Sequence, residues 1–150
     1  MKNNIKKVKF LIILLAFVMS IPLVGFDSAE KKGVPSVSAS ADKKSYSPGE
    51  SGVIILSFKT GSNVKIPKDP EVTVNLTSDN IEGHGLQDYT GGDGDYISNS
   101  KVKYNFTVPG GAASGSTITI TGNVKFGYCS TSDGVCKLGN KDFSAKIKVK

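Results

Sequence analysis

The chain has 150 residues, of which 38% are hydrophobic and 21% are charged, a composition typical of one globular domain. Its net charge of +6 includes four lysines in the first ten residues; from Glu30 onward, 15 lysines face 12 acidic residues. The sequence contains no arginine, and the remaining lysines form no basic run, which argues against a nucleic-acid-binding function.

The N-terminus predicts a secretory signal helix. Lysines precede an apolar run of about 17 residues from Phe10 to Phe26, and these are the charged and apolar regions of an export signal. We expect residues 1–29 to be removed as a signal peptide or retained as a membrane anchor, since the run is close to the lower length limit for a spanning helix. Residues 30–35 form a leader, and residues 36–150 form one exported domain, periplasmic or extracellular.

The exported part predicts a series of short strands separated by glycine, proline, asparagine and aspartate. In residues 71–77, for example, Val72, Val74 and Leu76 fall on one face, and this period of two indicates a half-buried strand. Gly122 interrupts a long run and predicts a bend or bulge. The predicted strands are residues 36–41, 52–59, 64–66, 71–77, 101–108, 116–128 and 143–149.

Seven or more short strands without a helical period predict an all-β, immunoglobulin-like antiparallel β-sandwich. The pattern by itself does not distinguish a sandwich from a small barrel. Residues 80–100 do not follow this pattern of short strands, because they contain five glycines and few apolar residues. We expect them to form a long surface loop, in which Tyr89 and Tyr96 offer aromatic rings for packing.

Cys129 and Cys136 are the chain's two cysteines, and six residues separate them between the last two predicted strands. In an exported protein an internal disulfide is the expected state of such a pair. The spacing allows two interpretations. A disulfide that closes so short a loop stabilises a domain by roughly 2.5 kcal/mol. The pair is equally placed for thiol exchange, because a disulfide near a loop tip is open to a partner's thiolate.

Other residues offer weaker candidate sites. His84 is the only histidine, and no nucleophile motif accompanies it, so we interpret it as a loop residue. Asp88, Asp93 and Asp95 do not have the spacing of an EF-hand loop and are interpreted as a solvated turn. Two cysteines and one distant histidine are too few for a structural zinc site. We therefore expect no metal and no cofactor.

The segment from Thr119 to Val149 (TITGNVKFGYCSTSDGVCKLGNKDFSAKIKV) resembles the end of the N-terminal periplasmic domain of the bacterial thiol:disulfide interchange protein DsbD. The likeness lies in a strand with an aromatic residue before a cysteine, a short loop, a second cysteine and a last strand. The opening VSASADKKSYSPGESGVIILSF and the segment KIPKDPEVTVNL are also similar to this family.

The resemblance implies an immunoglobulin-like domain that relays reducing equivalents between thioredoxin-like partners, supplied by a separate membrane electron transporter. It implies that Cys136 forms the mixed disulfide with a partner and that Cys129 resolves it. It also implies an aromatic cap over the pair, for which Tyr89 is the candidate.

Two functions are therefore predicted. The first is a thiol-disulfide exchange domain, an oxidoreductase without a small-molecule substrate. The alternative is a non-catalytic exported binding or structural module in which the disulfide stabilises the fold.

Overall fold

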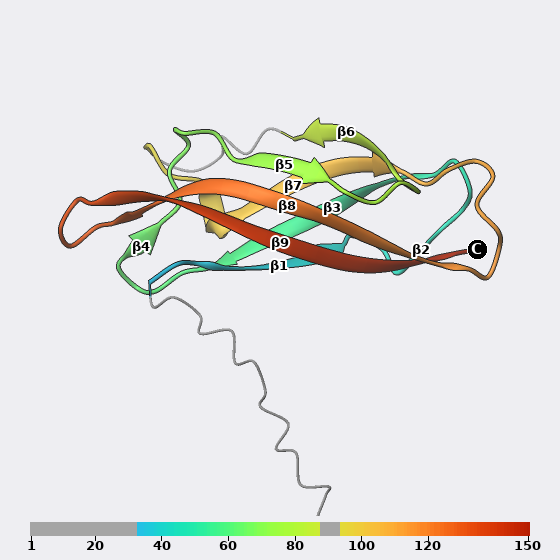
Figure 1. Cartoon of the computed structure of the whole chain (residues 1–150), viewed down its shortest axis with the longest axis horizontal. Coiled ribbons are helices and arrows are strands. Elements are labelled where there is room, and N and C mark those ends of the chain that lie inside the picture. Colours follow the sequence, from blue (N-terminus) through green and yellow to red (C-terminus); the bar gives the residue numbers. More distant parts are fainter. Residues whose placement is uncertain (1–32, 88–93) are drawn as a thin grey trace, which may run out of the picture. The chain divides into compact units, whose positions relative to one another are not determined.

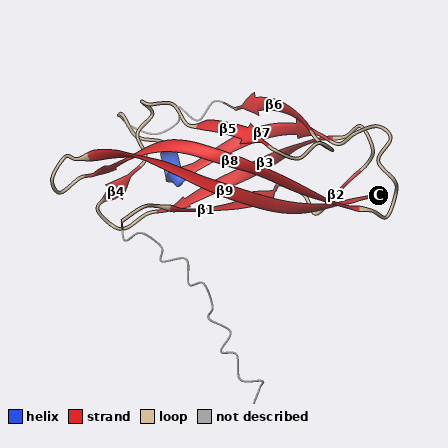
Figure 2. Ribbon diagram, viewed as in Figure 1, coloured by secondary structure: helices blue, strands red, loops and turns tan. Residues whose placement is uncertain are grey.

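The computed structural model describes residues 33–87 and 94–150, which are almost entirely β-structure (Figures 1 and 2). Within these residues no helix is long and apolar enough to cross a membrane. The signal segment lies outside the described residues. The elements are β1 (Ser36–Ala41), β2 (Ser45–Tyr46), β3 (Ser51–Lys59), β4 (Val64–Lys65), β5 (Thr73–Leu76), β6 (Glu82–Leu86), the 3₁₀ turn η1 (Ser98–Ser100), β7 (Lys101–Thr107), β8 (Thr117–Ser130) and β9 (Cys136–Val149).

The strands form two sheets, which confirms the sandwich and removes the barrel alternative. One sheet has the order β1-β3-β7-β6; the other has the order β2-β9-β8, with β4 and β5 both paired to β8. These are the A-B-E-D and G-F-C arrangements of an immunoglobulin-like sandwich. Pairing is antiparallel except between β2 and β9, which run parallel. The predicted all-β, immunoglobulin-like fold is confirmed.

The core lies between the sheets because alternate side chains of each strand point inward. In β3 the inward side chains are Ile54, Leu56 and Phe58, and in β7 they are Val102, Tyr104 and Phe106. Strands β8 and β9 contribute the opposite wall, with buried residues such as Phe126 and Ile147. Complete burial of each large apolar side chain stabilises the fold by about 1.5–3 kcal/mol.

The structure differs from the predicted strands most clearly at β6, at the start of β9 and at Gly122. The predicted loop at residues 80–100 is wrong in part, because Glu82–Leu86 form β6, an edge strand with a register shift between its two glycines. The last strand begins at Cys136 rather than Phe143. The register with β9 continues unbroken through Gly122, so this position holds no β-bulge; a Cβ there would lie 2.5 Å from Cζ of Phe143.

Asp42 holds the turn where the chain passes from β1, in one sheet, to β2, in the other. Its Oδ1 accepts hydrogen bonds of 2.7 Å from both the Tyr46 hydroxyl and the Val53 backbone N–H. Partial burial raises the pKa of Asp42, but these two hydrogen bonds favour the charged form and hold the pKa below its ordinary value. The ionised carboxylate therefore stabilises the sheet switch.

The substitution Asp42→Asn is expected to lower the free energy of unfolding at pH 7. Because the folded-state pKa lies below the ordinary 3.8, this contribution is present above that value and is lost as the pH falls through the folded-state pKa. Urea unfolding at pH 7 and at pH 2.5 should therefore show that the difference in the free energy of unfolding between wild type and Asp42→Asn becomes smaller in acid. Asp79→Asn, at an exposed turn, is the control. A stability difference of equal size at both pH values would contradict a stabilising role for the ionised Asp42 carboxylate.

Candidate functional site

The β8–β9 hairpin closes at a disulfide at one end of the domain, on the left in Figure 1. Cys129 and Cys136 are directly opposed in the register, with an S–S distance of 2.07 Å and a Cα–Cα distance of 4.0 Å. The next pair along, Ser130 and Val135, is hydrogen-bonded through the Ser130 N–H. The cysteines therefore occupy a non-hydrogen-bonded pair, in which facing side chains lie closest. The predicted internal disulfide is confirmed.

Both sulfur atoms lie on the outer face of the β9-β8 sheet. Phe126 and Tyr128 pack against the core, so the alternation of side chains sends Cys129 outward. The two cysteines nevertheless differ in exposure: Cys129 is 5% exposed and therefore buried, whereas Cys136 is exposed to solvent. Cys136 is therefore the solvent-exposed residue of the pair, and Cys129 is the buried one.

The chain between β4 and β5 lies against the outer face of β8 close to Cys129. Gly127 precedes Cys129 on the same outer face, and a Cβ at Gly127 would lie 3.1 Å from Cγ of Pro67 and from Cδ of Pro70. Strand β4 places Lys65 directly next to Cys129. The absence of a side chain at Gly127 thus lets the two prolines lie against the outer face of the sheet, two residues along β8 from Cys129.

A second segment, residues 95–97, is hydrogen-bonded to the chain between β4 and β5. Ile97 N–H donates to the carbonyl oxygen of Ile66 at 3.0 Å, and Lys68 N–H donates to that of Asp95 at 2.7 Å. Tyr96 forms an isolated bridge with Pro67, and the Lys65 Nζ lies 5.2 Å from the centre of the Tyr96 ring. The end of the predicted surface loop therefore packs on the β4 segment, in which Lys65 pairs with Cys129.

Tyr89, the predicted cap residue, lies outside the described residues. Tyr96 is the aromatic residue that the structure brings to this region, and the sequence indicated it only as a packing residue. The signal for it was its place in the same glycine-rich stretch. Its position next to Lys65 depends on pairing between segments that are distant in the chain.

The hairpin tip also carries exposed apolar side chains. Leu138 is 79% exposed and Val135 is 48% exposed, and both lie within two residues of Cys136. Leu138 opposes Gly127 in the register and therefore lies on the same outer face as the disulfide. Lys65, which pairs with Cys129, is exposed on this face, whereas the exposed Lys137 lies between Cys136 and Leu138 and therefore points to the other face. The site is a disulfide at a hairpin tip, with two exposed apolar side chains close to Cys136 in the chain and Lys65 beside Cys129.

Asp133 shapes the turn between the cysteines. Its Oδ1 accepts a 3.1 Å hydrogen bond from the Val135 N–H, and a hydrogen bond with the Ser130 side chain does most to lower the pKa of this carboxyl. The turn therefore carries a negative charge in the loop that the disulfide closes. That charge opposes the effect of Lys137 on any thiolate formed at Cys136.

The remaining candidates do not join this site. His84 lies on β6 and is hydrogen-bonded to Thr107, with 2.8 Å between Nε2 and Oγ1. Asp95 is exposed, and Asp88 and Asp93 lie outside the described residues. In residues 33–87 and 94–150, no group of three or more histidine, cysteine, aspartate or glutamate residues is placed to hold a metal ion.

Comparison with known proteins gave matches to solved structures only. No family model matches the chain, and no curated protein matches it. The sixth cohesin of Acetivibrio cellulolyticus scaffoldin B, solved in complex with a Cel5 dockerin, is 16% identical, with a TM-score of 0.39, over 76% of this chain and 99% of that one. A cohesin module from a Clostridium perfringens family 33 glycoside hydrolase is 14% identical, with a TM-score of 0.40, over 79% and 99%.

The strand order and the hairpin site together define the class of this protein: a disulfide-bonded, immunoglobulin-like β-sandwich. Its disulfide joins neighbouring strands of one sheet at a hairpin tip. In antibody domains, by contrast, the conserved disulfide links the two sheets through the core.

Proposed function

We propose that this chain is an exported, non-catalytic binding module that docks another protein on its disulfide-closed hairpin tip. The observation that carries the proposal is the position of its exposed apolar side chains. Within the described residues, Leu138 and Val135 are the large hydrophobic side chains that remain exposed, and both flank Cys136. Exposed apolar groups gathered at one place and rimmed by polar residues are typical of a protein interaction site.

The chemistry around the patch indicates the partner. Lys65 and Lys125 are exposed on the outer face of the β9-β8 sheet, at or near this end. A partner with an apolar side chain to cover Leu138 and carboxylates around it would complement this surface. The apolar contact would supply most of the affinity, and the charges would mainly raise the association rate.

The disulfide contributes rigidity in this proposal. It joins opposed residues one pair before the turn, so it keeps the two strands together at the tip of the hairpin. A tip that is already ordered loses less conformational entropy on binding than a flexible one. The cysteines would thus act on binding through the shape of the tip.

The proposal is tested by placing a photo-crosslinking amino acid at Leu138 of β9. The matched control is the same amino acid at Thr119 of β8, which is exposed on the same outer face of the sheet. The partner identified by crosslinking is then purified, and its affinity is measured for wild type and Leu138→Ser. We expect crosslinks from position 138 only, and an affinity about thirtyfold lower for Leu138→Ser, as for a binding hot spot of about 2 kcal/mol. Equal crosslinking from both positions, or unchanged affinity, would rule out the tip as the docking surface.

A second function, thiol-disulfide exchange of the kind the DsbD resemblance implies, is favoured by the unequal exposure of the two cysteines. A partner's thiolate would attack Sγ of exposed Cys136, and the electron pair of the broken S–S bond would leave on Cys129 as a thiolate. A second partner thiol would then release Cys136, so that the partner is oxidised and this domain is reduced. The partners would be thioredoxin-like proteins, supplied by a separate membrane transporter.

Native-state reduction separates the two functions. The folded protein is equilibrated with a thioredoxin couple, its free thiols are alkylated, and its fold is followed by near-ultraviolet circular dichroism. A purely stabilising disulfide should stay oxidised until denaturant is added, with a potential below roughly −300 mV. Reduction with the fold intact, together with partners trapped by Cys129→Ser and not by Cys136→Ser, would instead establish exchange.

A further inference from the structure

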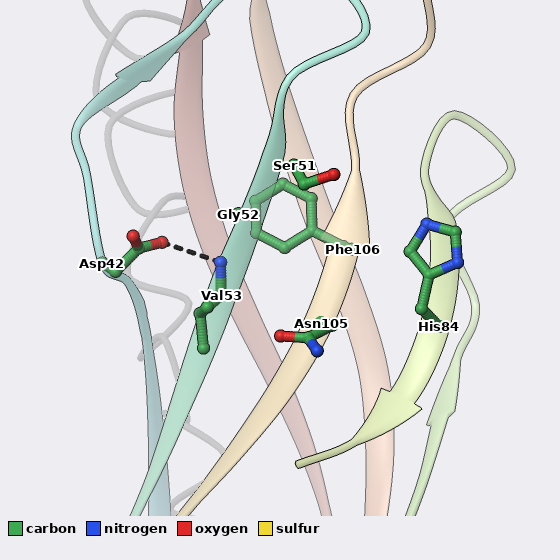
Figure 3. Close-up of a pocket in the computed structure, with 7 residues that line it drawn as sticks. All are labelled: Asp42, Ser51, Gly52, Val53, His84, Asn105 and Phe106. Carbon is green, nitrogen blue, oxygen red and sulfur yellow. Dashed lines mark hydrogen bonds between the residues drawn. The ribbon is translucent and has the colours of Figure 1, made fainter.

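The other sheet carries an open pocket with a volume of about 290 Å³ on its outer face (Figure 3). It lies over β3, β7 and β6, and not on the sheet that bears the disulfide. Its size is near the lower end of the range for small-molecule sites. The lining residues are Asp42, Ser51, Gly52, Val53, His84, Asn105 and Phe106.

The lining combines hydrogen-bonding groups of both kinds. Ser51 points outward from β3 and Asn105 points outward from β7, because their neighbours along each strand face the core. Figure 3 shows Asp42 and His84 on opposite sides of the pocket, with Ser51 and Asn105 between them. A carboxylate, a hydroxyl, an amide and an imidazole therefore surround one small space.

Neighbouring groups hold these side chains in place. Asp42 is fixed by its bonds from Tyr46 and Val53. The Gln87 amide donates to Oδ1 of Asn105 at 2.7 Å. Thr107 lies between two lining residues, with its Oγ1 2.8 Å from Nε2 of His84 and 3.0 Å from Oγ of Ser51. Such a preformed arrangement lowers the entropy lost when a ligand binds.

Each side chain keeps hydrogen-bonding capacity for a ligand. Both contacts to the Asp42 carboxylate use Oδ1, which leaves Oδ2 as an acceptor. The bond from Gln87 uses Oδ1 of Asn105, which leaves its Nδ2 as a donor within the described part of the chain. The contact to Thr107 uses Nε2 of His84 and leaves Nδ1 available. The pocket thus offers at least one acceptor and one donor.

The charge of the lining restricts the ligand class. Asp42 is the one carboxylate in the lining, and the nearby Lys43 ammonium is paired with Glu50 at 2.8 Å. An anionic ligand would be repelled by Asp42. A simple cation would pair with Asp42 but would leave the Asn105 amide donor without an acceptor. A neutral ligand with several hydroxyl groups satisfies both, because each hydroxyl donates and accepts.

We propose that this pocket binds a neutral, hydroxyl-rich ligand of the size of one sugar ring. Asp42 would accept from one hydroxyl, Asn105 would donate to a neighbouring one, and Ser51 and His84 would bond to the far side of the ring. This binding site is independent of the hairpin tip, since it lies on the other sheet. A chain that docks a protein at one end would thereby hold a carbohydrate on a separate face.

The test is a two-dimensional NMR titration of the ¹⁵N-labelled domain with the methyl glycosides of glucose, mannose, galactose and N-acetylglucosamine. At least one should shift the backbone amide signals of residues around the pocket in a saturable way, while butylammonium chloride and sodium acetate should not. Asn105→Ala should weaken that binding about tenfold, equivalent to about 1.4 kcal/mol. Ser51→Ala, at an exposed position, should weaken it without affecting folding.

Asn75→Ala, at an exposed position of β5 on the other sheet, is the matched control and should bind as wild type does. The proposal is overturned if none of the four glycosides produces saturable shifts. It is also overturned if butylammonium or acetate binds more tightly than every glycoside, or if Asn105→Ala and Ser51→Ala, confirmed as folded by their spectra, bind with wild-type affinity.

Discussion

The substitution Phe126→Ala is expected to lower the free energy of unfolding by about 3–5 kcal/mol. Phe126 is 2% exposed, and its ring contacts that of Phe58 edge-on, with 4.8 Å between the centroids. It also fills the space above Gly139 of β9, where a Cβ would lie 2.7 Å from its Cζ. Removal of the ring leaves a cavity between the sheets, at the base of the hairpin that carries the disulfide.

Urea unfolding followed by far-ultraviolet circular dichroism measures this effect, provided that the m-value is unchanged. Lys125→Ala, the exposed neighbour on the same strand, is the control and should change stability by less than about 0.5 kcal/mol. A loss under about 1 kcal/mol for Phe126→Ala would mean that the two sheets can close over the vacated space.

The double substitution Cys129→Ala with Cys136→Ser is expected to cost about 2.5 kcal/mol, because the unfolded chain regains the entropy of a short closed loop. Alanine is chosen for the buried position, since a serine hydroxyl there would add the cost of burying a polar group. Serine is tolerated at the exposed position. The fold should persist, because the core of the sandwich does not depend on these residues.

Wild-type protein unfolded in the presence of a phosphine reductant is the matched control and should lose the same amount. Loss of cooperative unfolding in both samples would contradict the expectation and would show that the hairpin tip is required for the sandwich. Loss of cooperative unfolding in the variant alone would mean that the substituted side chains, and not the missing disulfide, cause the effect.

The sequence predicted strands well where one face is buried and the other is not. β3, β7 and β8 lie within two residues of their predicted bounds. In β7 and β8 inward apolar residues alternate with mostly polar outward ones, and β3 is a run of mainly apolar and β-branched residues between turn residues. The prediction failed for β6, an edge strand that contains Gly83 and Gly85. It also failed for the first half of β9, where the exposed Leu138 and the glycine at position 139 break the alternation.

The chain alone thus determined an all-β domain, the inward faces of its main strands and a disulfide between its two cysteines. Only the tertiary structure decided that the disulfide lies on the outer face, that the prolines at positions 67 and 70 pack against Gly127 of the same strand as Cys129, and that Cys136 stays exposed. The same holds for the pocket that joins Asp42 to His84. The physical reason is that a period of two is a local property, whereas the neighbours of a side chain depend on the register between strands far apart in the chain.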